Sequence, residues 1–276
     1  MGIGVHELHF LQYAKTFRTF KKTITIGRQC LGVSDQYVRD AVMDSDYRND
    51  KYCEQLLLNY FGSIGKVDSV DNATYEGASI IQDMNLPLPS SIQSSYDTVI
   101  DFGCLEHIYN IPQALNNCSL FCKAGGQILH SLPANNCCGH GFWQFSPELF
   151  FSLYSNQNGY QDTEVFLVDV SKTGKWFKVN QPNNGKRVEV SSSTEAYVLV
   201  RTVLREGCFS HSDVQQSDYK FEWTNSSTKI VNENKSPKPN LIKRLLRSSP
   251  LYQFISPFRL NRRNSGLIEL NVKSLL

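Results

Sequence analysis

The sequence predicts an α/β fold: one doubly wound, mainly parallel, seven-stranded sheet with helices on both faces, followed by a basic C-terminal tail. Three observations support this prediction. Short β-branched runs alternate with helical segments over residues 22–203, the pattern of parallel strands joined by crossover helices. The first run ends at a glycine, as a strand entering a tight turn does. Three later runs each contain or end on an aspartate, which would place carboxylates along the carboxyl edge of the sheet.

The first half of the sheet is predicted from four short runs. KTITIG is the first strand, and apolar side chains at helical spacing over 50–60 predict a helix after it. The interval between the first and second strands is longer than a single helix needs, so we expect an additional segment there, at residues 34–48. Strands are predicted at residues 22–27, 66–71, 78–83 and 96–102.

The second half begins with a helix over 112–122 that stops at Ala-Gly-Gly. QILHSLP then predicts a fifth strand at 127–133. Ser146, followed by Pro147 and Glu148, is an N-cap with proline in the first turn and opens the next helix. The last two strands are predicted at 164–170 and 195–203.

Composition sets the broad class of the protein. A chain of 276 residues with 41% hydrophobic residues can bury one substantial core. No run approaches the roughly 18 apolar residues of a membrane span, and residues 1–20 mix charged and apolar side chains, so we expect neither a transmembrane helix nor a signal peptide. The eight cysteines include no C-x-x-C pair, which argues against a zinc site and favours reduced thiols in the cytoplasm.

The net charge of +2 hides an asymmetry, because residues 235–276 carry +8 and the remainder −6. The segment 241–260 mixes bulky apolar with basic residues. It is consistent with docking on the domain, with contact to an anionic membrane surface, or with binding an acidic polymer. The acidic body argues against nucleic acid as a partner. The predicted divisions are an N-terminal extension 1–20, a main domain 21–206, an extension and linker 207–234, and a basic tail 235–276.

The strongest local signal is YDTVIDFGCLEHIYN at 96–110, followed by AGGQILHSLPA at 124–134. This block resembles the class I S-adenosylmethionine (SAM) methyltransferases. The next segment, 136–150, is most similar to bacterial methyltransferase-like proteins of polysaccharide and sugar modification. The resemblance implies a Rossmann-like methyltransferase fold, SAM as cofactor, and a small-molecule or saccharide acceptor.

The resemblance also implies positions for the cofactor. Asp71 would bind the ribose hydroxyls, Asp83 and Met84 would meet the adenine, and the segment from Gly103 would border the methionine moiety. At the first turn only Gly27 matches the glycine pattern, and Arg28 would either grip the carboxylate of the cofactor or fill the pocket. The expected cofactor contacts are Gly27, Arg28, Gln29, Asp71, Asp83, Met84, Asp101 and Gly103.

Three side chains are candidates for catalysis. His140 lies between two glycines just after the fifth strand and is the candidate general base, with His107 and Glu106 behind it. A structural interpretation also stands, in which the glycines form a turn, His140 bonds a carbonyl group, and Glu106 and His107 cap a helix start.

Two functions of different classes follow. The first is a SAM-dependent methyltransferase (EC 2.1.1.-). The second is a catalytically degenerate methyltransferase fold that serves as a binding or scaffold module, which the altered Gly27 turn and the basic tail favour. A Rossmann-type NAD enzyme ranks below both, because G-x-G-x-x-G is absent after the first strand.

Overall fold

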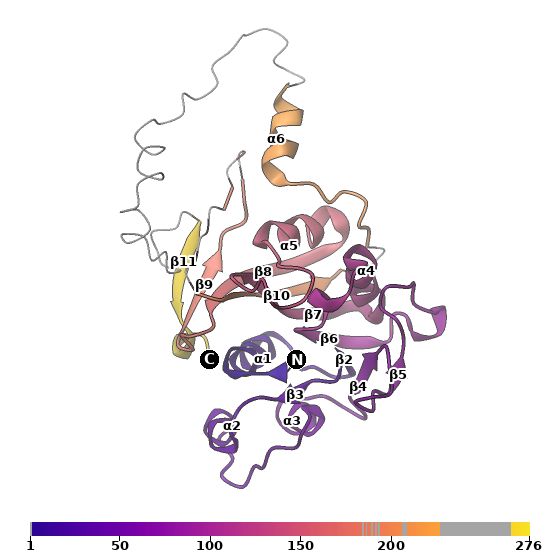
Figure 1. Cartoon of the computed structure of the whole chain (residues 1–276), viewed down its shortest axis with the longest axis vertical. Helices are drawn as coiled ribbons and strands as arrows, with labels where there is room; N and C mark the ends of the chain where they lie inside the picture. The colour runs from indigo at the N-terminus through magenta and orange to yellow at the C-terminus, as the bar shows by residue number, and fades with distance from the viewer. Residues whose placement is uncertain are drawn as a thin grey trace.

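A computed structural model describes residues 2–183, 185, 187–188, 190, 192, 194–205, 209–226 and 266–276. Within these residues, nine strands form one sheet in the order β11-β9-β8-β10-β7-β6-β2-β4-β5 (Figure 1). They are β2 (Thr23–Ile26), β4 (Asp68–Asp71), β5 (Ile80–Ile81), β6 (Tyr96–Phe102), β7 (Cys122–Asn135), β8 (Tyr160–Asp169), β9 (Lys175–Val179), β10 (Ala196–Leu204) and β11 (Leu267–Asn271). A separate pair of short strands is formed by β1 (Gly2–Ile3) and β3 (Cys30–Leu31).

The sheet has nine strands and is mixed, which corrects the prediction of seven mainly parallel strands. The pairings from β5 through β7 are parallel. β10 runs antiparallel between β7 and β8, and β9 and β11 add two further antiparallel pairings. β11 lies in the segment predicted as a basic tail. It becomes a strand by pairing with β9, so part of that tail belongs to the folded domain.

Helices cover both faces of the sheet, which confirms a doubly wound α/β fold. α1 (Val5–Phe17), α2 (Asp35–Val42) and α3 (Glu54–Tyr60) lie on one side, and α4 (Ile111–Phe121) and α5 (Pro147–Leu153) on the other (Figure 1). After β10 the chain forms α6 (Ser217–Ser226). Short 3₁₀ turns occur at η1 (Ser90–Ile92), η2 (Leu105–His107), η3 (Asn156–Asn158) and η4 (Val272–Ser274).

Each face of the sheet carries its own hydrophobic cluster. α1 and α3 bury side chains such as Phe10 and Leu57 on one face, and α4 and α5 bury Leu115 and Phe150 on the other. Phe10 is fully buried. Its ring lies 6.3, 6.5 and 5.9 Å from the rings of three residues on different strands, Phe102, Phe166 and Trp176. Residues 5–17, predicted as part of an extension, therefore supply one wall of the core.

Several local predictions are confirmed. β6 coincides with the predicted strand at 96–102. α5 begins as expected, with the Ser146 hydroxyl accepting a hydrogen bond from the Glu148 amide. β7 starts at Cys122 rather than at residue 127, so the glycine pair lies within the strand. A Cβ atom at Gly126 would lie 2.6 Å from the Cys122 sulfur, and only glycine allows this close approach.

The connection from β2 to β4 is long, as its sequence interval predicted. It contains β3, α2 and α3. The hydroxyl of Ser34 accepts a hydrogen bond from the Tyr37 amide and caps α2. The pair formed by β1 and β3 joins the start of the chain to this connection, just beyond the Gly27 turn.

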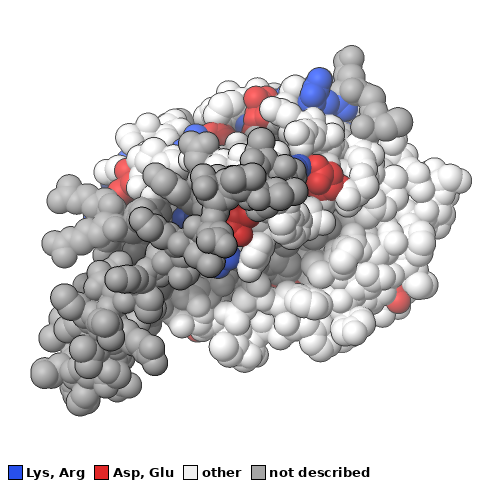
Figure 2. All heavy atoms as spheres, turned by 90° about the horizontal axis from the view of Figure 1, so that it is seen from above, with Lys and Arg blue, Asp and Glu red and all other residues white. Residues whose placement is uncertain are grey.

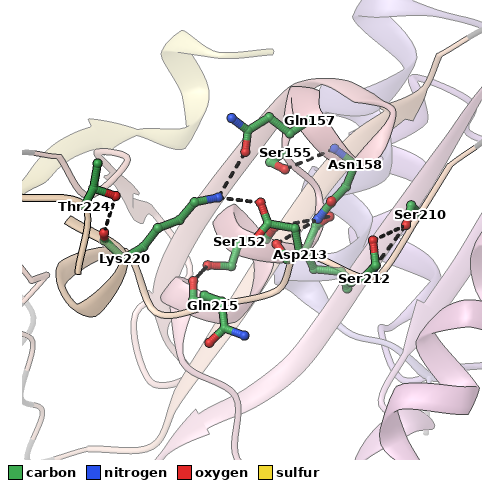
Figure 3. Close-up of polar contacts among 11 residues, drawn as sticks. Ser152, Ser155, Gln157, Asn158, Ser210, Ser212, Asp213, Gln215, Lys220 and Thr224 are labelled. Carbon is green, nitrogen blue, oxygen red and sulfur yellow. Dashed lines mark hydrogen bonds and ion pairs between the residues drawn. The ribbon is translucent and has the colours of Figure 1, made fainter. Parts of the chain in front are cut away.

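The segment between β10 and α6 is anchored on α5 and η3 (Figure 3). Asn158 donates hydrogen bonds from its amide group to the carbonyl of Ser152, and its own carbonyl accepts one from the amide of Ser210. Lys220, at the start of α6, donates to Gln157 and pairs with Asp213. The basic segment 241–260 lies outside the described residues, and so do its expected contacts.

The surface seen from the α6 side carries few charged groups among the described residues (Figure 2). The lysine and arginine side chains on this face are scattered and alternate with aspartate and glutamate, and they form no continuous basic patch. Within the part of the chain that is described, no helix combines the length and the apolar character needed to cross a membrane.

A partly buried histidine in the anchored segment makes stability depend on pH. His211 Nε2 lies 2.8 Å from the Tyr160 hydroxyl, and burial lowers the pKa of His211 to about 4. An unfolded histidine titrates near 6.5, so the unfolded chain binds the proton more tightly. The stabilisation that neutral His211 contributes is therefore fully present above about pH 6.5 and is lost as the pH falls toward 4.

Between pH 7 and pH 5, we therefore expect the unfolding free energy of wild type to fall by about 2 kcal/mol more than that of His211→Gln. Urea denaturation of both proteins at the two pH values measures this. All other groups are the same in the two proteins, so their contributions cancel in the difference. Equal pH dependence of wild type and variant would contradict the assignment.

Candidate active site

The strand order places a topological switch point between β2 and β6. The connection that leaves β2 passes over the face covered by α3, whereas α4 follows β6 on the opposite face. Adjacent strands whose connections diverge in this way leave a binding crevice at their carboxyl ends. Gly27 and Gly103 follow the two strands with φ angles of 68° and 82°. Both predicted glycine positions therefore lie at the switch point, with left-handed backbone that glycine adopts readily.

A cavity of about 380 Å³ opens at this edge of the sheet. Its walls come from the start of the chain, the ends of β6 and β8, the middle of β7, the start of β10 and the loop after β7. The lining residues are Gly2, Gly4, Val5, His6, Glu7, Phe102, Gly103, Glu106, Ser131, His140, Val168, Val170, Thr173, Glu195 and Tyr197.

The cavity is acidic. Glu7, Glu106 and Glu195 line it, and its lining includes no lysine or arginine from the described part of the chain. His6 does not offset these carboxylates, because burial lowers its pKa. The indole nitrogen of Trp176 donates to His6 Nδ1 at 3.1 Å, which requires an unprotonated ring nitrogen. A concave site lined by one sign of charge attracts ligands of the opposite sign, so this cavity suits a cationic ligand.

The three predicted catalytic side chains come together at the cavity. Glu106 and His107 lie on η2, and His140 reaches them from the loop after β7. The Nε2 atoms of His140 and His107 lie 3.2 and 3.8 Å from Glu106 Oε1. The Glu106 side chain is fully buried, whereas those of His107 and His140 are 44% and 49% exposed. The cluster therefore consists of a buried carboxyl group and two imidazoles that solvent can reach.

The turn that carries His140 is held against η2 by backbone contacts. The carbonyl of Glu106 accepts hydrogen bonds from the amides of Phe142 and Trp143, at 2.7 and 3.3 Å. Gly141 has a φ of 73°, and a Cβ atom there would lie 2.7 Å from that carbonyl oxygen. The second glycine of the GHG motif is thus required for His140 to approach Glu106. The turn predicted by the structural interpretation is present, and it places His140 within the cluster.

The cluster changes the proton affinity of its members. Burial, reinforced by the charge of Asp101, raises the pKa of Glu106 to about 8. Burial also lowers the pKa of His107, and His140 adds to that effect. The second oxygen of Glu106, Oε2, is buried and has no hydrogen-bond partner among the described residues.

Asp101 does not contact the cavity, which corrects its assignment as a cofactor ligand. Its side chain is fully buried, and Oδ1 accepts hydrogen bonds from the amides of Cys104 and Leu105. Oδ2 lies 2.8 Å from His130 Nδ1, and His130 Nε2 lies 2.7 Å from the Tyr154 hydroxyl. Burial raises the pKa of Tyr154, so its phenol donates to Nε2 and leaves Nδ1–H to donate to Asp101. Asp101 thus positions the start of η2.

Arg28 and Gln29 also make contacts other than those expected of cofactor ligands. Arg28 pairs with Glu54 of α3 at 2.7 Å, donates to the carbonyl of Glu76 at 2.8 Å, and stacks on Tyr52. Gln29 is fully buried, and its amide donates to the carbonyl of Ile26 at 2.7 Å. Arg28 therefore neither lines the cavity nor fills it, and Gln29 has no surface with which to touch a ligand.

The remaining predicted cofactor residues lie along the same edge, on β4 and after β5. Asp71 ends β4 next to β2, and its carboxylate accepts a hydrogen bond from the amide of Asn72. Asp83 accepts two hydrogen bonds from Asn85, both at 2.8 Å. Met84 is 5% exposed and belongs to the core cluster around α4. None of the three lines the acidic cavity, so they border a different part of the edge.

Sequence reasoning missed the contribution of the chain start to the cavity. Glu7 Oε1 accepts a hydrogen bond from the Ser131 hydroxyl of β7 at 2.6 Å, and Oε2 accepts one from the amide of Gly4. The spacing of Gly4 and Glu7 is a capping pattern that could have indicated a helix start. No local pattern indicates the contact with Ser131.

Comparison with known proteins gives likenesses only to solved structures. No protein-family model matches the chain, and no curated protein does. A SAM-dependent methyltransferase from Thermotoga maritima is 15% identical, with 73% of this chain and 92% of that chain covered and a TM-score of 0.35. The N-methyltransferase NodS from Bradyrhizobium japonicum is 11% identical, with 72% and 96% covered and a TM-score of 0.39.

A third similar structure is the 1,6-didemethyltoxoflavin-N1-methyltransferase of Burkholderia thailandensis, which holds its acceptor and S-adenosylhomocysteine. It is 12% identical, with 73% of this chain and 78% of that chain covered and a TM-score of 0.38. Identities and TM-scores this low indicate no function for the chain.

Proposed function

We propose that the protein is a SAM-dependent methyltransferase acting on a small-molecule acceptor. The observation that carries this proposal is the acidic cavity at the carboxyl edge of β6, beside the switch point between β2 and β6. The resemblance of residues 96–110 and 124–134 to class I methyltransferases agrees with it. Bound SAM supplies a methyl group on a positively charged sulfonium. The carboxylates of Glu7 and Glu195 suit that charge.

Some residues at the carboxyl edge of the sheet would hold the cofactor, and others would orient the acceptor. Gly27 and Gly103 leave room for the close approach of a ligand to the backbone. Asp71 would accept hydrogen bonds from the ribose hydroxyls, and Asp83 would meet the adenine. The cavity walls would hold the acceptor atom in line with the methyl group, and such orientation contributes most of the rate enhancement in a direct transfer.

The acceptor that the site supports best is a saccharide or another hydroxyl-bearing ring compound. Tyr109 and Phe142 are 75% and 69% exposed and pack edge to face beside the turn that carries His140. The indole of Trp143, 37% exposed, is fixed by its hydrogen bond to the carbonyl of Ile108. Aromatic rings next to a few polar groups are typical of ligand-binding surfaces. The three aromatic side chains offer flat apolar faces to the ring of an acceptor.

We expect Asp71→Ala to weaken SAM binding about 10- to 100-fold, because two hydrogen bonds from the ribose to a charged acceptor would be lost. Isothermal calorimetry with SAM and S-adenosylhomocysteine measures this. Asp40→Ala, on the exposed surface of α2, is the matched control and should bind as wild type does.

Unchanged affinity in the Asp71 variant would contradict the ribose assignment. If neither ligand bound wild-type protein at millimolar concentration, the cofactor assignment would be wrong and the scaffold function would stand in its place.

A further inference from the structure

Glu106, His107 and His140 form a constellation of metal-binding type. Each offers one ligand atom, a carboxylate oxygen or an imidazole nitrogen, and the three atoms lie within 4.8 Å of one another. The two Nε2 atoms approach the same oxygen, Glu106 Oε1. A single cation among the three atoms could bind all of them after small shifts of the two exposed imidazoles.

The buried carboxyl group provides the second, independent observation. The Glu106 side chain has no exposed surface, and no residue in the described part of the chain hydrogen-bonds its Oε2 atom. Buried polar atoms are nearly always satisfied, and a buried charge is normally paired or bound to a metal. Among the described residues, the ion-pair partners of Glu106 are only the two histidines. The cluster therefore presents one oxygen of Glu106, Oε1, to the two imidazoles, while the described residues leave the bonding capacity of the other oxygen, Oε2, unfilled.

The ligand set indicates the kind of cation. Imidazole nitrogen favours zinc, cobalt, iron and related transition metals, whereas magnesium prefers oxygen ligands. Three protein ligands with two of them half exposed leave coordination positions open, as in catalytic rather than structural sites. The absence of a C-x-x-C pair argues only against zinc sites built from cysteine. It does not argue against this site, which has no cysteine ligand.

We infer that Glu106, His107 and His140 bind a divalent transition-metal cation, such as Zn²⁺, and that its open position takes a hydroxyl oxygen of the acceptor. His140 then acts as a ligand rather than as the general base. Binding to the cation acidifies the hydroxyl. Its proton passes to water, the oxygen attacks the methyl carbon as the bond from carbon to sulfur breaks, and the sulfonium becomes a neutral thioether. The role in transfer rests on the proposed function, whereas the cation site does not.

The cation site is tested on the full-length protein after treatment with EDTA and gel filtration. Calorimetry with Zn²⁺, and visible absorption with Co²⁺, should show binding of one equivalent in the absence of SAM. His107→Ala, His140→Ala and Glu106→Gln should each weaken binding at least tenfold, because each removes one of three ligands. Melting curves establish that the variants are folded, and the two exposed histidines provide variants that leave the core intact.

Two control variants separate this site from adventitious binding. Tyr109→Ala alters an exposed neighbour that has no metal ligand and should bind Zn²⁺ normally. Cys138→Ser removes an exposed thiol two residues from His140 and should also bind normally. Failure of wild type to bind either cation, equal binding by the histidine variants, or loss of binding in Cys138→Ser would overturn the proposal.

SAM calorimetry on the metal-free and metal-loaded protein distinguishes the two proposals. Cation binding without SAM binding would support the metal site and refute its role in methyl transfer. SAM binding without cation binding would refute the metal site and leave the methyltransferase assignment standing.

Discussion

Asp101→Ala is expected to lower the unfolding free energy by about 3–5 kcal/mol. The substitution leaves three buried donors without an acceptor, namely the amides of Cys104 and Leu105 and Nδ1–H of His130. It also releases the start of η2, which positions Glu106 and His107. Urea denaturation measures the loss of stability, and Zn²⁺ titration of the folded variant measures the effect on the cluster.

Asp101→Asn is the matched control. Its amide oxygen can still accept from the two backbone amides, and its amide nitrogen can donate to His130 once that ring changes its tautomer. We expect most of the stability to be retained in this variant. If the asparagine variant were as unstable as the alanine variant, the charge of Asp101 rather than its hydrogen bonds would hold the loop.

Phe10→Ala is expected to cost a similar amount, about 3–5 kcal/mol, and to lower the melting temperature by roughly 6–20 °C. The Phe10 ring is fully buried and packs against aromatic residues on β6, β8 and β9. Its removal leaves a cavity between α1 and the sheet that rigid neighbours cannot close. Thermal melting followed by circular dichroism measures the change.

Tyr75→Ala is the control for Phe10→Ala, since Tyr75 is an aromatic residue that is 93% exposed. Its melting temperature should stay close to that of wild type. Equal melting temperatures for wild type and the Phe10 variant would show that α1 is an appendage, as the sequence had suggested, rather than part of the core.

Local patterns predicted the parts of the fold that depend on neighbours in the sequence. The β-branched runs at Thr23–Ile26 and Tyr96–Phe102 are strands, and Ser146 caps the helix that follows it. Such patterns failed where pairing with a distant segment decides the structure. β11 becomes a strand only against β9, and β7 begins as early as Cys122 because that residue pairs with Tyr96 of β6, with the glycine pair in the register shift before Gln127.

The same distinction applies to the candidate site. The sequence alone identified Glu106, His107 and His140 as chemically active types near two strand ends and predicted a turn at Gly27, and the family resemblance implied a cofactor contact at Gly103. It did not distinguish Asp101, which is buried behind the site, from residues that line it, because residue type and spacing do not reveal which way a side chain at a strand end points.

Only the tertiary structure decided what these residues do together. The GHG turn must lie on the Glu106 carbonyl before His140 can reach the carboxyl group, and α1 must pack on the sheet before Glu7 can close the cavity against Ser131. Cavity walls and clusters of ligand atoms are made by segments far apart in the chain. Their positions follow from the packing of the whole core, whereas the strands, turns and caps of this protein follow from residues a few positions apart.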